Sequence, residues 1–431
     1  MKIELAYAKG VQTAIIPDDN IIGILTPNDV PCEFTGLQEV ERSVDHPIDC
    51  ERLQDLVKPG EKIAIITSDI TRPMPSKTVL PVVLQRLKAA GISMEDVTVV
   101  FALGSHRKHT EDEKRYLVGD SVYGSVRCID SDPNDFVHLG TTTRGTPVDI
   151  FTPVAQADRR ICLGNIEFHY FAGYSGGAKA IMPGVSTRAA IQANHSRMVE
   201  ESSHAGKIEG NSVREDIDEV QEFVPIDFIV NVVLDEHKQI IKCVSGHWKH
   251  AHRAGCDFLD TLYKIEISET ADIVLVSPGG YPKDINLYQA QKALDNAKHA
   301  VSEGGIIILL ASCIEGLGEG VFERWMTQSD TTDFMVQEIK RNFELGGHKA
   351  AAIGMVMQKC DVYLVSDLEE EFARSIFFEP YPTLQEAVIQ GFIRKGLDAK
   401  FIVMPFGGST LPSIQIKTKE AYSKVLMSES V

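Results

Sequence analysis

The segment from His169 to His195 reads HYFAGYSGGAKAIMPGVSTRAAIQANH and combines two imidazoles, a lysine amine and a glycine-rich turn. An imidazole can act as an acid or a base near neutral pH and is a common metal ligand. Glycines such as those around Lys179 let backbone N–H groups approach an anion closely. This inventory suits a small anionic substrate together with a phosphorylated or metal-bearing cofactor.

Three further fragments carry polar groups of the same kind. Ser68–Pro73 reads SDITRP, Gly104–Arg107 reads GSHR, and Asn286–Lys292 reads NLYQAQK. An arginine can fork onto a phosphate or a carboxylate. Gln289 and Lys292 have the i, i+3 spacing that points two side chains of a helix at one ligand. Together the fragments predict a site for a carboxylate or a phosphate.

Each fragment also has an ordinary structural interpretation when taken alone. SDITRP can be an Asx-type turn with a surface arginine. His106 can be a solvated loop histidine beside His109, and His195 can be a satisfied histidine of a helix that Ser186 caps. The face of Gln289 and Lys292 can simply be solvated.

Several well-defined sites are absent from the sequence. There is no Walker A loop, no G-x-G-x-x-G after a strand, no H-E-x-x-H and no cysteine–histidine zinc spacing. There is also no G-x-S-x-G nucleophile elbow, which weakens a hydrolase interpretation. A dinucleotide-binding function is therefore poorly supported.

Composition limits the partners and the location of the protein. The chain has 431 residues, and 61 acidic against 43 basic residues give a formal net charge of −18. Such a chain repels nucleic acid and anionic membrane surfaces, so an anionic substrate needs a locally basic pocket. Eight dispersed cysteines without a C-x-x-C pair, no signal peptide and no membrane-length window predict a cytoplasmic protein. The candidate cations are Arg72, Arg107, Lys179 and Lys292.

The pattern of apolar runs predicts the elements that position these groups. Short runs rich in Val, Ile and Leu alternate with helical patterns, which is typical of parallel sheets covered on both faces. We expect an α/β fold of two domains, each with a mainly parallel open sheet flanked by helices, and an active site in the cleft between them. Each fragment follows the carboxyl end of a predicted strand, which is where open α/β sheets bind ligands.

A domain boundary is expected near residues 265–271. Residues 1–268 are predicted to form an N-terminal α/β domain with the cofactor-binding and acid/base residues. Residues 269–410 are predicted to form a C-terminal α/β domain with the substrate-binding residues. Residues 411–431 are predicted as a helix that can pack back on the first domain.

The fragments DITRP, GSHR, HYFAGYSGGAK, the later NH and LYQAQKAL occur in one order between Asp69 and Lys292. In that order they resemble the nickel-pincer-nucleotide-dependent lactate racemase family of 2-hydroxy-acid racemases and epimerases. Members of that family hold Ni(II)-pyridinium-3,5-bisthiocarboxylate mononucleotide, with nickel bound through sulfur, carbon and sulfur. The resemblance implies that this cofactor is attached covalently at Lys179 and can be absent from recombinant protein.

The resemblance also implies partners and residue roles. The partners would be a small 2-hydroxy-acid substrate and the biosynthesis proteins that supply the pincer nucleotide. His106 and His169 match the family's acid/base histidines, and His195 matches its nickel ligand. The cofactor-binding positions match Asp69, Ile70, Thr71, Arg72 and Lys179, and the substrate-binding positions match Arg72, Tyr288, Gln289 and Lys292.

The expected reaction interconverts the enantiomers of a 2-hydroxy acid, lactate by default, through hydride transfer to the cofactor. The α-hydrogen of such an acid is a very weak acid because the neighbouring carboxylate is already anionic. Removing hydride instead leaves a neutral, planar keto group that is open on both faces. One histidine can then take the hydroxyl proton of one enantiomer, and the second histidine can serve the other. The alternatives are a metal-dependent hydrolase that uses the histidine cluster and a non-catalytic protein that binds a small anion or phosphate.

Overall fold

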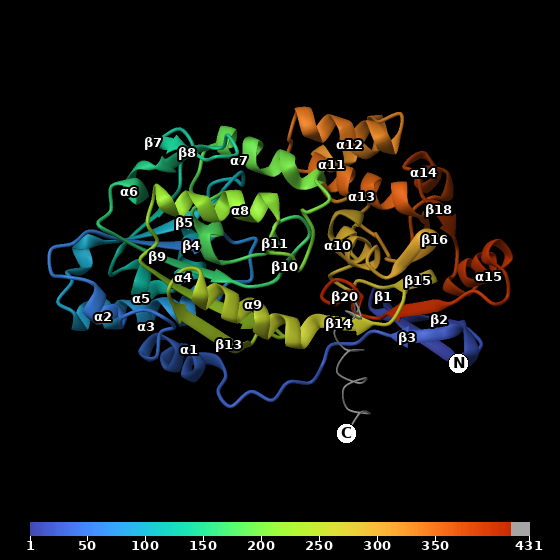
Figure 1. Ribbon diagram of the computed structural model, residues 1–431, viewed down its shortest axis with the longest axis horizontal. Helices are drawn as coiled ribbons and strands as arrows, with labels where there is room; N and C mark the ends of the chain where they lie inside the picture. Colours follow the sequence, from blue (N-terminus) through green and yellow to red (C-terminus); the bar gives the residue numbers. More distant parts are fainter. Residues whose placement is uncertain (415–431) are drawn as a thin grey trace, which may run out of the picture. The chain divides into compact units, whose positions relative to one another are not determined.

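The computed structural model describes residues 1–414 and divides into two compact units, both of the α/β class (Figure 1). The N-terminal unit contains Asp29–Leu262 and Gln337–Leu345. The C-terminal unit contains Met1–Asn28, Tyr263–Val336 and the chain from Gly346 on. Both units have a mainly parallel sheet flanked by helices, so the predicted fold class is confirmed.

A six-stranded sheet with the order β13-β12-β9-β4-β5-β6 forms the centre of the N-terminal unit. All neighbouring strands pair in parallel except β12 and β13, which are antiparallel. The strands are β4 (Ile63–Ser68), β5 (Val97–Ala102), β6 (Arg127–Asp130), β9 (Arg159–Asn165), β12 (Phe228–Leu234) and β13 (Ile240–Gly246).

Helices cover this sheet because its strands are apolar on both faces. Successive side chains of a strand point to opposite faces, so Ile63 and Ile65 of β4 share one core with Val79 and Val83 of the neighbouring helix α3. Residues of the other face, such as Ile66, are equally buried. The helices are α1 (Gly36–Asp45), α2 (Leu53–Leu56), α3 (Ser76–Ala89), α4 (Glu111–Val118), α5 (Asp120–Tyr123), α6 (Thr152–Ala155), α7 (Arg188–His195), α8 (Ser212–Glu219) and α9 (His250–Tyr263).

The strand order reverses at β4. From β4 the chain adds β5 and β6 on one side, and it later places β9 on the other side. The loops that follow β4, β5 and β9 therefore meet at one edge of the sheet. Short pieces complete this region, namely the hairpin β7 (Phe136–Thr141) and β8 (Pro147–Phe151), the pair β10 (Phe168–His169) and β11 (Gly173–Tyr174), and the 3₁₀ turn η3 (Gly177–Ala180).

The C-terminal unit has a second six-stranded sheet, with the order β18-β17-β16-β15-β19-β3 and only parallel pairs. The strands are β3 (Ile21–Ile24), β15 (Ala271–Val276), β16 (Val301–Leu310), β17 (Asp361–Val365), β18 (Glu379–Tyr381) and β19 (Phe401–Met404). Its order reverses at β15, and the loop after β15 leads into helix α10.

The helices of this unit are α10 (Leu287–Ala297), α11 (Gly320–Gln328), α12 (Thr332–Arg341), α13 (Gly347–Lys359), α14 (Glu370–Ser375) and α15 (Leu384–Lys395). The last turns of α12 belong to the segment Gln337–Leu345, which is assigned to the N-terminal unit.

The ends of the chain differ from the expected domain bounds of 1–268 and 269–410. Met1–Asn28 belongs to the C-terminal unit, because β3 pairs with β19 and the hairpin β1 (Lys2–Tyr7) and β2 (Gly10–Ile15) adds Leu5 to that unit's core. The predicted helix over 411–431 is wrong at its start. Leu411–Ile414 forms strand β20, which pairs in parallel with β14 (Lys264–Ile267), and residues 415–431 lie outside the described part of the chain.

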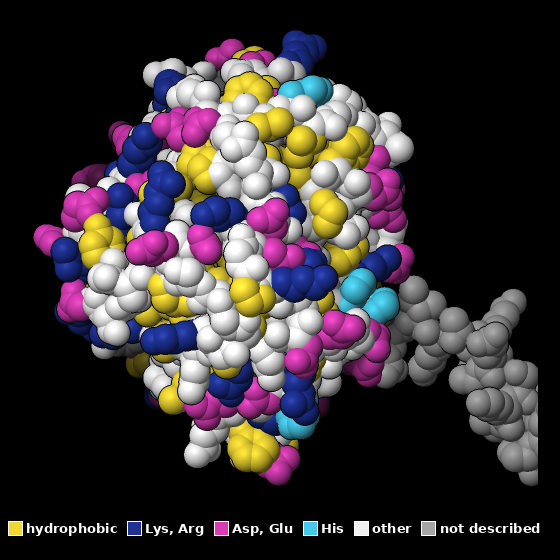
Figure 2. Space-filling view, turned by 90° about the vertical axis from the view of Figure 1, so that its left-hand side faces the viewer, with side chains coloured by type: hydrophobic (Ala, Val, Ile, Leu, Met, Phe, Trp, Pro, Cys, Tyr) yellow, Lys and Arg dark blue, Asp and Glu magenta, His cyan; other side chains and the backbone are white. Residues whose placement is uncertain are grey.

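The surface and the helices add two observations on the class of protein. On the face that Figure 2 presents, acidic and basic side chains are interspersed, so the net charge of −18 does not gather there into one acidic patch. Within residues 1–414, no helix combines the length and the apolar character that a membrane crossing needs.

We predict that Leu5→Ala destabilises the C-terminal unit, although Leu5 lies near the start of the chain. Leu5 is 1% exposed within that unit's core, and truncation of such a residue costs about 2–5 kcal/mol. The two tryptophans allow the measurement, because Trp325 lies in the C-terminal unit and Trp248 in the N-terminal unit. Urea unfolding of single-tryptophan variants should show a weakened Trp325 transition.

The matched control is Leu87→Ala, which truncates a fully buried leucine of α3 in the N-terminal core. This change should weaken the transition that Trp248 reports. If Leu5→Ala moved only the Trp248 transition, the assignment of the first 28 residues to the C-terminal unit would be wrong.

Candidate functional site

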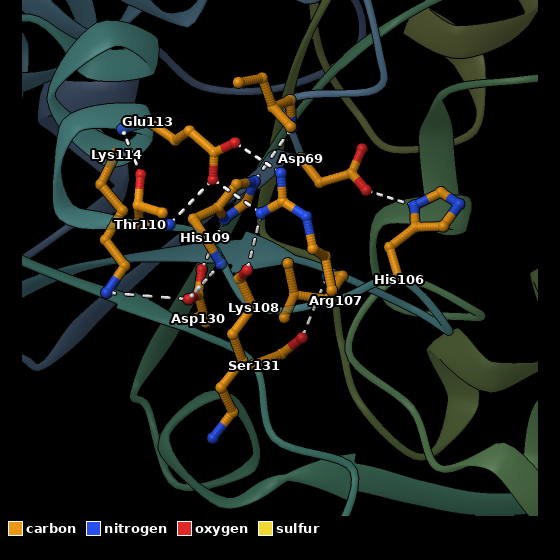
Figure 3. A network of polar contacts seen from close by, with 12 residues as sticks. Asp69, His106, Arg107, Lys108, His109, Thr110, Glu113, Lys114, Asp130 and Ser131 are labelled. Atoms are coloured by element: carbon orange, nitrogen blue, oxygen red, sulfur yellow. Dashed lines mark hydrogen bonds and ion pairs between the residues drawn. The ribbon is translucent and has the colours of Figure 1, made fainter.

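A buried carboxylate after β4 contacts His106 from the loop after β5. Asp69 is 3% exposed, and its Oδ2 accepts a short hydrogen bond from Nδ1 of His106 (Figure 3). Burial alone would raise the pKa of Asp69, but the hydrogen bond and charge of His106, with help from Thr71, lower that pKa below its usual value. A carboxylate can only accept, so Nδ1 of His106 carries a proton, and in the neutral ring Nε2 keeps its lone pair.

The segment from Asp69 to Arg72 forms the Asx-type turn that the sequence suggested. Oδ1 of Asp69 accepts from the backbone N–H and the hydroxyl of Thr71 at 3.1 and 2.7 Å, and the N–H of Arg72 donates to the Asp69 carbonyl at 3.1 Å. Arg72 is exposed, and within residues 1–414 its guanidinium has no ion-pair partner. The turn therefore presents a cation next to the Asp69–His106 pair.

His109 is a buried residue that supports the Asp69–Arg72 turn through hydrogen bonds. Its Nε2 accepts from the backbone N–H of Ile70 at 3.1 Å, so the neutral ring carries its proton on Nδ1, which lies 2.6 Å from Oδ1 of Asp130. The backbone N–H of His109 donates to the other oxygen of Asp130 at 3.0 Å (Figure 3). One buried imidazole thus ties the loops after β4 and β5 to the end of β6. The sequence interpretation mentioned His109 only as a neighbour of His106, and the structure shows it as a buried residue with a hydrogen bond to Asp130.

Arg107 does not join the expected basic group. Its guanidinium makes two hydrogen bonds to Glu113, at 2.8 and 2.6 Å, and it is directed away from His106 (Figure 3). Glu113 also completes the predicted capping box with Thr110 at the start of α4. Arg107 therefore stabilises the beginning of that helix.

Three of the expected site residues gather around Phe171 in the loop region after β9. The ring of Phe171 is 4.5 Å from the ring of His169 and 4.9 Å from that of His195, in edge-to-face contacts. The amine of Lys179 lies 5.8 Å from the centre of the same ring. Phe171 is almost fully buried, so it serves as a fixed apolar centre for the three polar groups.

The surroundings of Lys179 and His169 disfavour their charged forms. Burial lowers the pKa of Lys179 well below its usual value, and the positive charges of Arg214 and Arg72 lower it further. Burial likewise lowers the pKa of His169, with Lys179 and Arg72 as the next causes. Nδ1 of His169 accepts a hydrogen bond from the N–H of Ala172 at 3.3 Å, so the neutral ring carries its proton on Nε2.

His195 is held in the opposite tautomer at the end of α7. The amide nitrogen of Asn194 donates to Asp216 at 2.7 Å and to the Val213 carbonyl at 3.2 Å, which fixes the orientation of that amide. Its oxygen therefore faces Nδ1 of His195 at 2.8 Å and accepts the ring proton. Nε2 of His195 then carries the lone pair that a metal ligand requires. The predicted cap of α7 by Ser186 is wrong, because Thr187 makes the capping hydrogen bond and Ser186 bonds the Ile181 carbonyl.

The glycine-rich loop packs closely on the protein beneath it. Gly173 has φ +75°, and a Cβ atom there would lie 2.0 Å from the carbonyl oxygen of Lys207. The N–H of Gly177 donates to the side chain of Asn231 at 2.8 Å. The sequence interpretation had these glycines approach an anion, whereas the contacts found here are with neighbouring backbone and side chains.

The remaining site residues lie at the start of α10 in the C-terminal unit. Asn286 caps this helix as predicted, accepting from the N–H of Gln289 at 3.0 Å. Gln289 and Lys292 are exposed one turn apart. Tyr288 is half-buried, with its ring against Phe322 and under the Lys349 amine, which lies 3.9 Å from the ring centre.

Sequence reasoning missed the residues that support the site from behind. Phe171 and Asn194 stand inside quoted fragments, so their proximity to the histidines was available as a signal. Arg214 and His252 had no such signal, because arginine and histidine side chains on helices usually reach solvent. Asp130 follows a separate strand and could not be paired with His109 from the sequence.

Comparisons with known proteins show the family of this chain. The model of the lactate racemase N-terminal domain matches residues 7–206, and that of the lactate racemase C-terminal domain matches residues 267–411. The chain is 34% identical over 417 residues to a lactate racemase of Lactiplantibacillus plantarum, covering 94% of this chain and 98% of that one. It is 32% identical over 421 residues to a lactate racemase of Thermoanaerobacterium thermosaccharolyticum, covering 95% and 98%.

Solved structures give the same picture. The lactate racemase apoprotein from Thermoanaerobacterium thermosaccharolyticum is similar with a TM-score of 0.87 and 31% identity, covering 96% of this chain and 100% of that one. A protein from Thermotoga maritima has a TM-score of 0.61 at 17% identity, covering 88% of this chain and 97% of that one, and shares the fold.

We predict that the buried neutral histidines make the fold sensitive to acid. Burial and the charges of Arg214 and Arg253 lower the pKa of His252, so the folded state resists protonation there while the unfolded chain takes up a proton below about pH 6.5. The free energy of unfolding should therefore fall below that pH, by about 1.4 kcal/mol per pH unit for each such histidine. His252→Gln keeps a donor for the Ser175 carbonyl and should reduce the slope by that amount.

The measurement is urea unfolding at a series of pH values between about 5 and 8. His237→Gln is the matched control, since His237 is an exposed histidine of the same unit, and it should leave the slope unchanged. An unaltered slope in His252→Gln would show that this ring does not resist protonation.

Proposed function

Because this chain belongs to the lactate racemase family, we propose that it is an isomerase that interconverts the enantiomers or epimers of a small 2-hydroxy acid, with lactate as the default substrate. We include in the proposal hydride transfer to a nickel-pincer nucleotide attached at Lys179. The observation that supports it most is the grouping of His169, Lys179 and His195 around Phe171, with the lysine amine in surroundings that disfavour its charge.

The residues fit that cofactor on chemical grounds. A lysine forms a covalent bond only as an uncharged amine, and the surroundings of Lys179 favour that form. A nickel ligand needs an imidazole lone pair, and Asn194 leaves that pair on Nε2 of His195. No cluster of three or more His, Cys, Asp or Glu side chains within residues 1–414 has the geometry of a metal site. A nickel ion held mainly by the cofactor's own sulfur and carbon atoms would need only His195 from the chain.

When bound, the cofactor would supply an electrophilic acceptor for the substrate's α-hydride, and the chain would hold the substrate. The exposed guanidinium of Arg72 can grip a carboxylate through two parallel hydrogen bonds. Gln289 and Lys292 offer an amide and an ammonium on one face of α10 for the same purpose. Fixing the carboxylate also fixes the α-carbon, which limits the positions that the hydroxyl group can take.

The two histidines would move the hydroxyl proton. Nε2 of His106 has the lone pair to accept it, and the positive charge that then forms lies beside Asp69. His169 would serve the other enantiomer, as an imidazolium when it donates a proton and as a neutral ring with a lone pair on Nε2 when it accepts one. Both forms carry a proton on Nδ1, so the hydrogen bond from the Ala172 N–H to that atom has to break in the reaction.

The proposal extends to the surroundings of the enzyme. We place it in the cytoplasm, where cofactor-biosynthesis proteins would supply the pincer nucleotide. Two alternative functions were a metal-dependent hydrolase and a non-catalytic protein that binds a small anion or phosphate. No observation in the structure specifically favours either of them.

We predict that protein from a host able to make the cofactor carries an adduct on Lys179. Whole-protein mass spectrometry should show the added mass in the wild type and none in Lys179→Ala, because the tether is gone. His195→Ala should keep the adduct but lose nickel, measured by elemental analysis, because it removes a metal ligand and not the tether. An adduct that persisted in Lys179→Ala would assign the attachment to another residue.

We predict that His106→Ala and His169→Ala each reduce racemisation by at least about 10²–10⁴-fold, the usual value of one positioned acid or base. The reaction is followed by chiral chromatography at matched cofactor occupancy. His138→Ala is the control, since His138 is an exposed histidine that makes a similar 2.6 Å contact with Asp149. Substantial racemisation by either site variant would refute the assignment of two acid/base histidines.

A further inference from the structure

Within residues 1–414, Arg214 is the largest side chain that is completely buried, and it lies directly beneath the glycine-rich loop. From α8, its Nε donates to the carbonyl of Ala172 at 3.2 Å, and a terminal nitrogen donates to the carbonyl of Tyr174. Its other terminal nitrogen is 3.5 Å from Asp218. A buried arginine that binds two carbonyls of one loop fixes the path of that loop.

The loop is held at each successive carbonyl from 172 to 175. Arg214 binds the first and the third, the N–H of Gly206 donates to the Gly173 carbonyl at 3.1 Å, and Nε2 of His252 donates to the Ser175 carbonyl at 2.8 Å. The loop leads directly into η3, the turn that carries Lys179, and η3 packs against α8, β9 and β4. The position of the lysine backbone therefore depends on the anchor that Arg214 provides.

Arg214 also brings a positive charge beneath the lysine. Asp218 is the acidic partner of Arg214, but Asp218 also contacts Arg253. One carboxylate between two guanidinium groups leaves a net positive charge in this buried cluster. The titratable and charged groups that interact with the amine are Arg214 on α8, Arg72 after β4, His169 after β9 and His252 on α9. A second cation in such a medium disfavours an ammonium ion.

We propose that Arg214 is a positioning residue for Lys179: its buried guanidinium fixes the loop that leads to the lysine and sets a fixed positive charge near the lysine amine. That charge disfavours the ammonium form, and the value of this effect for catalysis rests on the proposed function, since an uncharged amine is the nucleophilic form. The effect itself is a property of the chain and is tested on cofactor-free protein.

The experiment measures how readily Lys179 reacts with acetic acid N-hydroxysuccinimide ester, an amine-acylating reagent. Cofactor-free protein is labelled briefly at a series of pH values, and each lysine is followed by peptide mass spectrometry. The midpoint of the pH profile is compared, because limited access to a half-buried lysine slows labelling equally at every pH. In the wild type, Lys179 should reach its midpoint at a lower pH than the exposed Lys249.

Arg214→Met removes the charge and should move the midpoint of Lys179 toward that of Lys249. At about pH 8 its labelling should fall about tenfold, the change in amine fraction for one pKa unit. Arg214→Lys keeps the positive charge but loses the paired hydrogen bonds of the guanidinium to the loop carbonyls. The labelling midpoint of Lys179 should therefore stay near the wild-type value, while the melting temperature drops. Should Arg214→Met fail to fold, Arg214→Gln removes the charge and keeps a donor for the loop carbonyls.

Arg160→Met is the matched control. Arg160 is also a buried arginine that donates to backbone carbonyls, those of Val154, Ala155 and Ala157, but it stands near the opposite end of β9 from the loop. Its loss should lower stability and leave the Lys179 profile in place. An unshifted profile in the charge-removing variants, or an equal shift in Arg160→Met, would overturn the role of Arg214. A failure of the proposed function would instead appear as a missing Lys179 adduct with the shifted profiles intact.

Discussion

The site depends on the place of β4 between β5 and β9. Parallel strands all end at the same edge of a sheet, and the chain leaves β4 toward β5 on one side but returns to β9 on the other. The loops after these three strands are therefore adjacent without a helix crossing between them. Asp69 and His106 lie in the first two of these loops, and His169 lies in the short strand β10 that follows β9. The C-terminal unit repeats this arrangement at β15, where the reversal of strand order leads to Gln289 and Lys292 at the start of α10.

The loop after β9 shows how stability and reactivity oppose each other here. Burying a guanidinium and an imidazole beneath the loop has a desolvation cost, which the hydrogen bonds of Arg214 and His252 to backbone carbonyls offset. The same low-dielectric surroundings remove the stabilisation that water would give to a protonated lysine. Gly173 and Gly177 permit the close approach that makes this burial possible, since a Cβ atom at either position would collide with the layer beneath.

Much of the framework could be predicted from the sequence, because strands buried on both faces are continuous apolar runs. Ile63–Ser68 and Val97–Ala102 are such runs, and the polar groups that follow them were correctly placed at one sheet edge. Long-range pairing left no local signal, so Met1–Asn28 was assigned to the wrong unit and Leu411–Ile414 was taken for a helix. The sequence also could not show which of the neighbouring residues His106 and His109 is structural, because each histidine binds a carboxylate from a distant segment. His109 binds Asp130 and has a structural role, whereas His106 binds Asp69 in the site.

The two histidines expected to act on opposite enantiomers have unequal surroundings. A positive charge on His106 would lie beside the Asp69 carboxylate, whereas one on His169 would lie near the positive groups of Lys179 and Arg72. Enantiomers have equal free energies in water, so this inequality cannot shift the equilibrium of a racemase. Under the proposed function it can only change how the barrier is divided between the two proton transfers and which protonation state of the enzyme accumulates. The geometry thus favours a resting state in which His106 is ready to accept a proton, whereas His169 must first gain a second proton before it can donate one, and a complete cycle must restore both rings to their neutral forms.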